Sequence, residues 1–124
     1  MKKVLIMLVM LFTFSMNSFA NAVSIAKNAK YEFKVDNRKL ANVLNMSDEQ
    51  IELSDSIMKE LERGMEFAES MNSDESRDMI ALNTVKKNLY QMHYVLNKEQ
   101  YRDYLKIINV TLKNKGFDMT KFND

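Results

Sequence analysis

The chain has 124 residues, 18 basic and 17 acidic side chains, no cysteine and no proline. The near-neutral charge argues against a nucleic-acid-binding protein, which usually carries a basic surplus, and the absence of cysteine excludes disulfide stabilisation. With only Gly64 and Gly116 as glycines, the chain lacks the turn residues that strand-rich folds need. We therefore expect one all-α domain, either a small antiparallel helical bundle or a curved helical hairpin, with one short and three long helices.

Residues 1–20 have the pattern of a secretory signal peptide. Lys2 and Lys3 precede an apolar run, and Ser18-Phe19-Ala20 places small residues at the positions that signal peptidase reads. The apolar run is too short for a membrane span. We expect cleavage after Ala20, with a cut after Ala22 as the alternative. The product is then periplasmic or secreted, without stable membrane insertion.

Residues 21–35 are expected to form a flexible N-terminal arm. Tyr31, Phe33 and Val35 alternate with polar residues, so a short extended stretch is the alternative. The helical domain is predicted over 36–116, beginning with a short helix that Asp36 caps and that ends near Asn45. Its apolar face consists of Leu40, Ala41, Val43 and Leu44.

The clearest local pattern is a helix start at Met46. Ser47 is placed as the N-cap and Gln50 as the residue that closes a capping box, while Met46 and Ile51 form a hydrophobic staple. The long helix that follows runs to about Met71, and Gly64 in its middle costs about 1 kcal/mol against alanine, unless it permits a close helix contact or a bend. The apolar seam of this helix is Ile51, Met58, Leu61, Met65 and Ala68.

Two more long helices follow. Ser73 is a plausible cap for a helix over about 74–96, and Gly116 is expected to stop the last helix as a left-handed C′ residue. The tail over 117–124 either docks or stays loose. The predicted seams are Leu82, Val85, Leu89, Met92 and Leu96 in the third helix, and Tyr101, Tyr104, Leu105, Ile108 and Leu112 in the fourth.

The helix start repeats fifty residues later. Leu96, Asn97 and Gln100 repeat the pattern of Met46, Ser47 and Gln50, and Tyr101 pairs with Leu96 as a second staple. The repeated pattern resembles the LTxxQ motif, which the Spy and CpxP family of periplasmic stress proteins carries twice. Met46, Ser47 and Asn97 depart from it, because the family prefers Leu, Thr and Thr at these positions.

The resemblance implies a thin, curved dimer of antiparallel helices that needs no cofactor. Family members act as ATP-independent chaperones or as modulators of envelope stress, and they hold unfolded protein clients on a concave face. The motif residues would then fix the helix starts rather than contact a client.

Four tyrosines cluster around the predicted turn between the third and fourth helices, and they suit either the edge of the core or an interface. They are Tyr90, Tyr94, Tyr101 and Tyr104. His93 is the only histidine, and a metal site needs more ligands at suitable spacing, so we expect a packed or half-exposed side chain. The methionines left after cleavage either fill the core or offer a pliable surface to varied clients.

We expect no catalytic residues and no enzymatic activity, because no nucleophile arrangement or phosphate-binding loop is readable. The first hypothesis is an exported protein that binds protein clients, either as a chaperone or as a stress modulator. One alternative is a structural or interaction module, such as a homodimer, that binds one specific partner. Another is a metal-responsive sensor domain that uses His93.

Overall fold

The computed structural model describes residues 29–122. Its elements in chain order are η1 (Ala29–Tyr31), α3 (Asn37–Leu44), α4 (Asp48–Glu69), α5 (Asp74–Val95), α6 (Lys98–Asn114) and α7 (Met119–Phe122). Every regular element in this range is a helix, so the all-α prediction is confirmed. The predicted signal peptide, its cleavage site and residues 21–28 lie outside the described residues.

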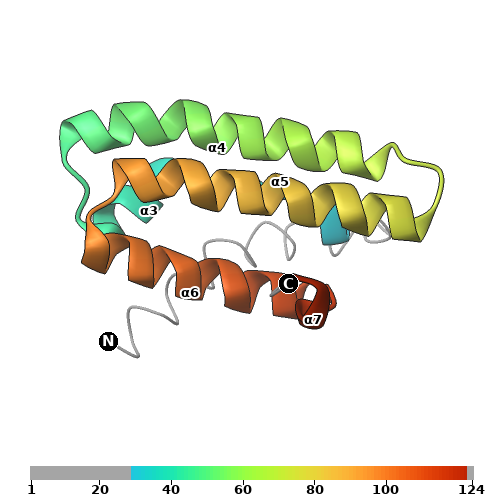
Figure 1. The fold of residues 1–124 in the computed structure, drawn as a ribbon. Helices are drawn as coiled ribbons and strands as arrows, with labels where there is room; N and C mark the ends of the chain where they lie inside the picture. The colour runs from blue at the N-terminus through green and yellow to red at the C-terminus, as the bar shows by residue number, and fades with distance from the viewer. Residues whose placement is uncertain (1–28, 123–124) are drawn as a thin grey trace.

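Helices α4, α5 and α6 run side by side in alternating directions (Figure 1). The short helix α3 lies behind α5, and α7 folds back beside the end of α6. This arrangement is a helical bundle rather than a lone hairpin. The two-residue connection between α5 and α6 forces them to be antiparallel neighbours.

Local capping explains where the helices begin and end. The Asp36 carboxylate accepts hydrogen bonds from the backbone N–H groups of Arg38 and Lys39, and Asn45 ends α3 in the left-handed conformation with φ of 56°. Gly116 has φ of 91°, as predicted for a C′ glycine. The following Phe117 N–H donates to the Leu112 carbonyl across 3.0 Å, which completes a Schellman-type C-cap.

Gly64 lies at a close contact between α4 and α5. A Cβ atom at Gly64 would come within 2.3 Å of the Thr84 Cγ2 atom on α5. Of the two roles considered for this glycine, the structure therefore supports the close helix contact.

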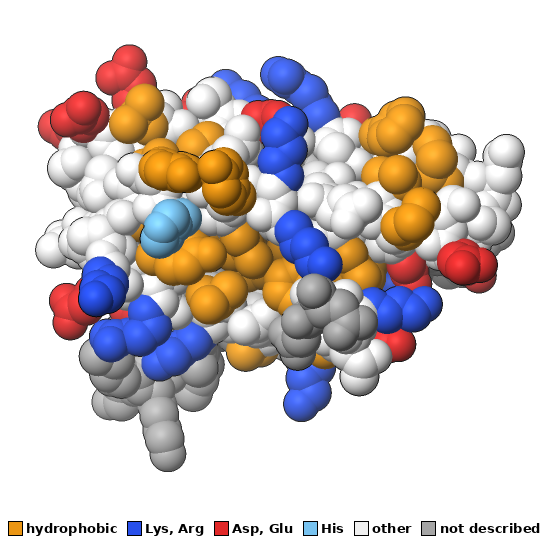
Figure 2. All heavy atoms as spheres, viewed as in Figure 1, with side chains coloured by type: hydrophobic (Ala, Val, Ile, Leu, Met, Phe, Trp, Pro, Cys, Tyr) orange, Lys and Arg blue, Asp and Glu red, His pale blue; other side chains and the backbone are white. Residues whose placement is uncertain are grey.

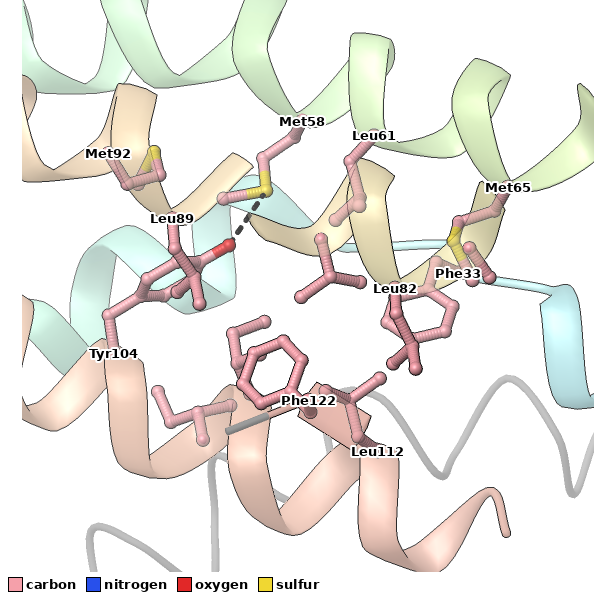
Figure 3. Close-up of a cluster of buried hydrophobic side chains, with 14 of the residues drawn as sticks. Phe33, Met58, Leu61, Met65, Leu82, Leu89, Met92, Tyr104, Leu112 and Phe122 are labelled. Carbon is pink, nitrogen blue, oxygen red and sulfur yellow. Dashed lines mark hydrogen bonds between the residues drawn. The ribbon is translucent and has the colours of Figure 1, made fainter. Parts of the chain in front are cut away.

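The core is one cluster of apolar side chains with a polar centre. The Tyr104 hydroxyl donates to Asn88 Oδ1 across 2.5 Å and lies 3.7 Å from the Met58 sulfur, in the middle of the packed side chains (Figure 3). Most of the predicted seam residues are buried, and Ile51, Tyr101 and Leu105 are only partly buried. The buried seam residues are Met58, Leu61, Met65, Ala68, Leu82, Val85, Leu89, Met92, Leu96, Tyr104, Ile108 and Leu112.

Residues 29–35 and the described part of the tail differ from the loose segments that we considered. Tyr31 and Phe33 are buried in the core, as are Phe117 and Phe122. Aromatic side chains bury a large apolar area, and this burial holds both segments against the bundle.

Candidate functional site

Both predicted capping boxes are present. The Ser47 hydroxyl accepts from the Gln50 backbone N–H across 3.2 Å, and Gln50 Oε1 accepts from the Ser47 N–H across 2.8 Å. At the start of α6, Asn97 Oδ1 and the Gln100 amide make the same pair of bonds, at 2.8 and 2.9 Å. Each box satisfies backbone donors that a helix start leaves free.

The two boxes also bond to each other, which the sequence did not reveal. Gln50 Nε2 donates to Gln100 Oε1 across 2.8 Å, and Gln100 Nε2 lies 3.2 Å from Gln50 Oε1. Gln50 Nε2 further donates to the Val95 carbonyl, and Gln100 Nε2 donates to the carbonyls of Leu44 and Asn45. We call Gln50 and Gln100 the glutamine pair, and it joins the end of α3, the starts of α4 and α6, and the end of α5.

The glutamine pair fixes the turn that carries the predicted tyrosine interface, but the four tyrosines do not share one environment. Tyr104 is fully buried, and burial raises the pKa of its phenol. Its assignment to a possible interface is therefore wrong, because a side chain enclosed by the core reaches no partner. Tyr101 is partly buried, whereas Tyr90 and Tyr94 are 65% and 72% exposed.

The exposed tyrosines form an aromatic cluster with the single histidine. We define this aromatic cluster as Tyr90, His93, Tyr94 and Tyr101. The rings of Tyr90 and Tyr94 meet edge to face at 5.2 Å, and their hydroxyls are hydrogen-bonded at 3.1 Å, which raises the pKa of the Tyr94 phenol. The His93 ring lies 5.6 Å from that of Tyr94 and 5.0 Å from that of Tyr101, so the cluster bridges α5 and α6.

Positive charge borders the aromatic cluster. Residues 79–95 contain no carboxylate, and Lys86 and Lys98 have no ion-pair partner among the described residues. Arg102 makes only a long, exposed contact of 3.8 Å with Glu99. Lys and Arg side chains flank the apolar side chains around the histidine on two sides (Figure 2). Such a surface attracts acidic groups over several ångströms.

The charges are unevenly divided among the helices. Helix α4 carries eight acidic and two basic side chains, whereas α6 carries four basic and two acidic ones. The near-zero total charge of the chain conceals this separation.

The surroundings of His93 do not resemble a metal site. Its ring neighbours are Tyr94 and Tyr101, and no group of three or more His, Cys, Asp or Glu side chains that could hold a metal occurs in residues 29–122. The methionines divide between core and surface: Met58, Met65 and Met92 are buried, whereas Met79 is 56% exposed.

A second surface feature is a shallow groove of about 300 Å³ between α4 and α5, beside Gly64. Its walls include Glu60, which pairs with Lys87 at 2.7 Å and also accepts a hydrogen bond from Gln91. These contacts hold the pKa of Glu60 below its usual value. Phe67, which is 58% exposed, stands at its edge.

No family model, curated protein or solved structure matches this chain. The resemblance to the Spy and CpxP family therefore stays a prediction. Within residues 29–122, no helix combines the length and the hydrophobicity that a membrane span requires.

Proposed function

We propose that this chain is an exported, non-enzymatic protein that binds other polypeptides through the aromatic cluster. The observation that carries the proposal is the exposure of Tyr90 and Tyr94, which hold each other in an edge-to-face pair on the surface. Tyrosine offers a large, rigid contact area with a hydroxyl that hydrogen-bonds to water or to a partner. Exposed apolar patches of this kind mark interaction sites.

The setting of the cluster supports binding rather than chemistry. The glutamine pair anchors the turn between α5 and α6, so the rings are displayed on a rigid support and little conformational entropy is lost when a partner binds. The basic side chains at Lys86, Lys98 and Arg102 favour clients that present acidic groups next to apolar ones.

A chaperone that works without ATP is the form of this function that we favour. The paired capping boxes agree with the family resemblance, and a mixed aromatic and basic surface accepts many sequences loosely. The alternative of a module for one specific partner, including a second copy of the chain, uses the same surface. The metal-sensor alternative has less support, because tyrosine rings rather than ligating groups surround His93.

The direct test is suppression of aggregation, measured by light scattering of an unfolding test protein without ATP. The mature chain is expected to suppress scattering, and the Tyr90→Ser/Tyr94→Ser variant is expected to lose most of this effect. Phe67→Ser is the matched control, because it removes an exposed aromatic side chain away from the cluster. Equal loss in both variants, or no suppression by the mature chain, would refute the proposal.

Export has its own test. Expressed with its own N-terminus in a bacterium, the chain is expected in the periplasm or the medium, with a mass that corresponds to cleavage after Ala20. An uncleaved cytoplasmic product would contradict the proposed export.

A further inference from the structure

Residues 30–35 contact all three long helices, and we call them the strap. The strap begins in the 3-10 turn η1 and continues without regular structure to Val35. Tyr31 and Phe33 point inward and are 7% and 2% exposed, whereas Lys34 between Phe33 and Val35 is exposed. Two side chains of the strap at alternate positions, Tyr31 and Phe33, therefore enter the core.

The N-terminal end of the strap is held by a carboxylate on α5. Asp78 accepts a hydrogen bond of 2.6 Å from the Tyr31 hydroxyl and pairs with Lys30 Nζ at 3.0 Å. The ring of Phe117 completes this pocket, because it meets the Tyr31 ring edge to face at 5.8 Å and lies 4.7 Å below the Lys30 ammonium.

The rest of the strap is held by groups from the other two long helices. Lys115, the C-cap of α6, donates to the Glu32 carbonyl across 2.8 Å and lies 4.9 Å over the Phe33 ring. On α4, Glu62 Oε1 accepts from the Val35 backbone N–H at 3.2 Å. The Phe33 ring itself enters the core beside Met65 and Leu82 (Figure 3).

The contacts between the bundle and the strap are of the same kinds as those between a receptor and a bound peptide. Side chains of the bundle bond to the strap backbone at Glu32 and Val35, and separate pockets take Tyr31 and Phe33. Recognition of extended peptides works in this way: bonds to the main chain supply affinity, and pockets for alternate side chains supply selectivity. We call the surface that the strap covers the strap groove. The ion pair between Lys30 and Asp78 at its edge adds a preference for a basic residue.

We propose that the strap groove is a peptide-binding site, that the strap is its resident ligand, and that the strap groove accepts in trans a segment with a basic residue followed by two aromatic residues at alternate positions. The strap competes with such a segment. The apparent affinity for the segment is therefore the intrinsic affinity multiplied by the fraction of molecules in which the strap groove is empty. The proposal uses none of the residues of the aromatic cluster, so it does not depend on the function proposed above.

The test uses a fluorescent peptide with the sequence of residues 29–36 and the full mature chain in which the strap is weakened by Phe33→Ala. The peptide is expected to bind this variant at least about tenfold more tightly than the wild-type chain and to raise its Tm with peptide concentration. A control peptide with alanine in place of its phenylalanine is expected to do neither. Tyr31→Ala provides a second strap-weakened chain if Phe33→Ala does not fold.

Adding Asp78→Asn to a strap-weakened chain tests whether the strap groove itself binds the peptide. The peptide is expected to bind several-fold more weakly, because the strap groove loses the carboxylate that pairs with the basic residue of the peptide. If the peptide neither binds nor stabilises a folded, strap-weakened chain, or if Asp78→Asn leaves its affinity unchanged, the strap groove is ordinary core and the proposal is wrong.

Discussion

Gln50 and Gln100 each serve as a capping residue and as a contact between helices. Gln100 is 8% exposed, and its side-chain amide donates to two carbonyls at the end of α3 besides closing its own capping box. Local sequence spacing predicted the caps, since a capping box involves residues only three positions apart. It could not predict the glutamine pair, because that contact joins residues fifty positions apart.

We predict that Gln50→Ala and Gln100→Ala each lower the free energy of unfolding by roughly 1–3 kcal/mol, because each leaves partly buried donors or acceptors unpaired. The loss at Gln100 is expected to be the larger. The double variant is expected to lose about 0.5–3 kcal/mol less than the sum of the single losses. Urea denaturation measures all three, and strictly additive losses would mean that the glutamine pair contributes no coupling.

Lys115 is a cation in a largely apolar place, and burial lowers its pKa to about 8, although Glu32 opposes the shift. The unfolded chain keeps the ordinary lysine pKa near 10.5. Between these two values the unfolded state binds more protons than the folded state, so this group makes stability rise with pH.

The expected slope from Lys115 is at most about 1.4 kcal/mol per pH unit above pH 8. Denaturation curves at several values between pH 7.5 and about 9.5, below the range in which unfolded tyrosines ionise, measure this slope. Lys115→Met is the control, and the difference between the two chains isolates the lysine. A difference that does not change with pH would show that the lysine titrates normally.

At the scale of the elements, the helices were predictable because their signals are local. Each predicted N-cap residue caps its helix, namely Asp36, Ser47, Ser73 and Asn97. The spacing of apolar residues also identified most of the buried helix faces. The strap was not predictable in the same way. Its burial depends on Asp78, Glu62 and Lys115, which come from three separate parts of the chain.

Tyr104 shows what the sequence alone could not decide about the candidate site. The sequence placed it both on the seam of the last helix and in a possible interface, and spacing alone could not choose between them. The choice depends on Asn88, a buried residue on α5 whose Oδ1 accepts a hydrogen bond from the Tyr104 hydroxyl. Of the four predicted tyrosines, the two that lie outside the seams, Tyr90 and Tyr94, are the exposed ones.

Helices α4 and α5 meet closely at Gly64 and Thr84. Gly64→Ala is expected to destabilise the chain by about 1–3 kcal/mol, because the new methyl group meets Thr84. Adding Thr84→Ala removes the obstacle, so the double variant is expected to recover most of the loss with help from the helix propensity of alanine. Thermal unfolding of both variants and of Thr84→Ala alone measures this, and a stabilising single Gly64→Ala change would contradict the close contact.

For the whole molecule, the decisive property is the division of charge and exposed rings between its faces. The acidic surplus of α4 and the basic border of the aromatic cluster give the bundle two electrostatically different sides. A client with acidic and apolar groups should therefore approach the α5 and α6 side, and added salt should slow its association.

The most direct measurement maps the binding surface by amide NMR of the labelled mature chain while an unfolded test protein is added at low salt. We predict shifts concentrated around Tyr90, Tyr94, Lys98 and Tyr101, and their loss in the Tyr90→Ser/Tyr94→Ser variant. No shifts at all, or shifts centred on the acidic side of α4, would contradict the claim that the aromatic cluster binds polypeptides.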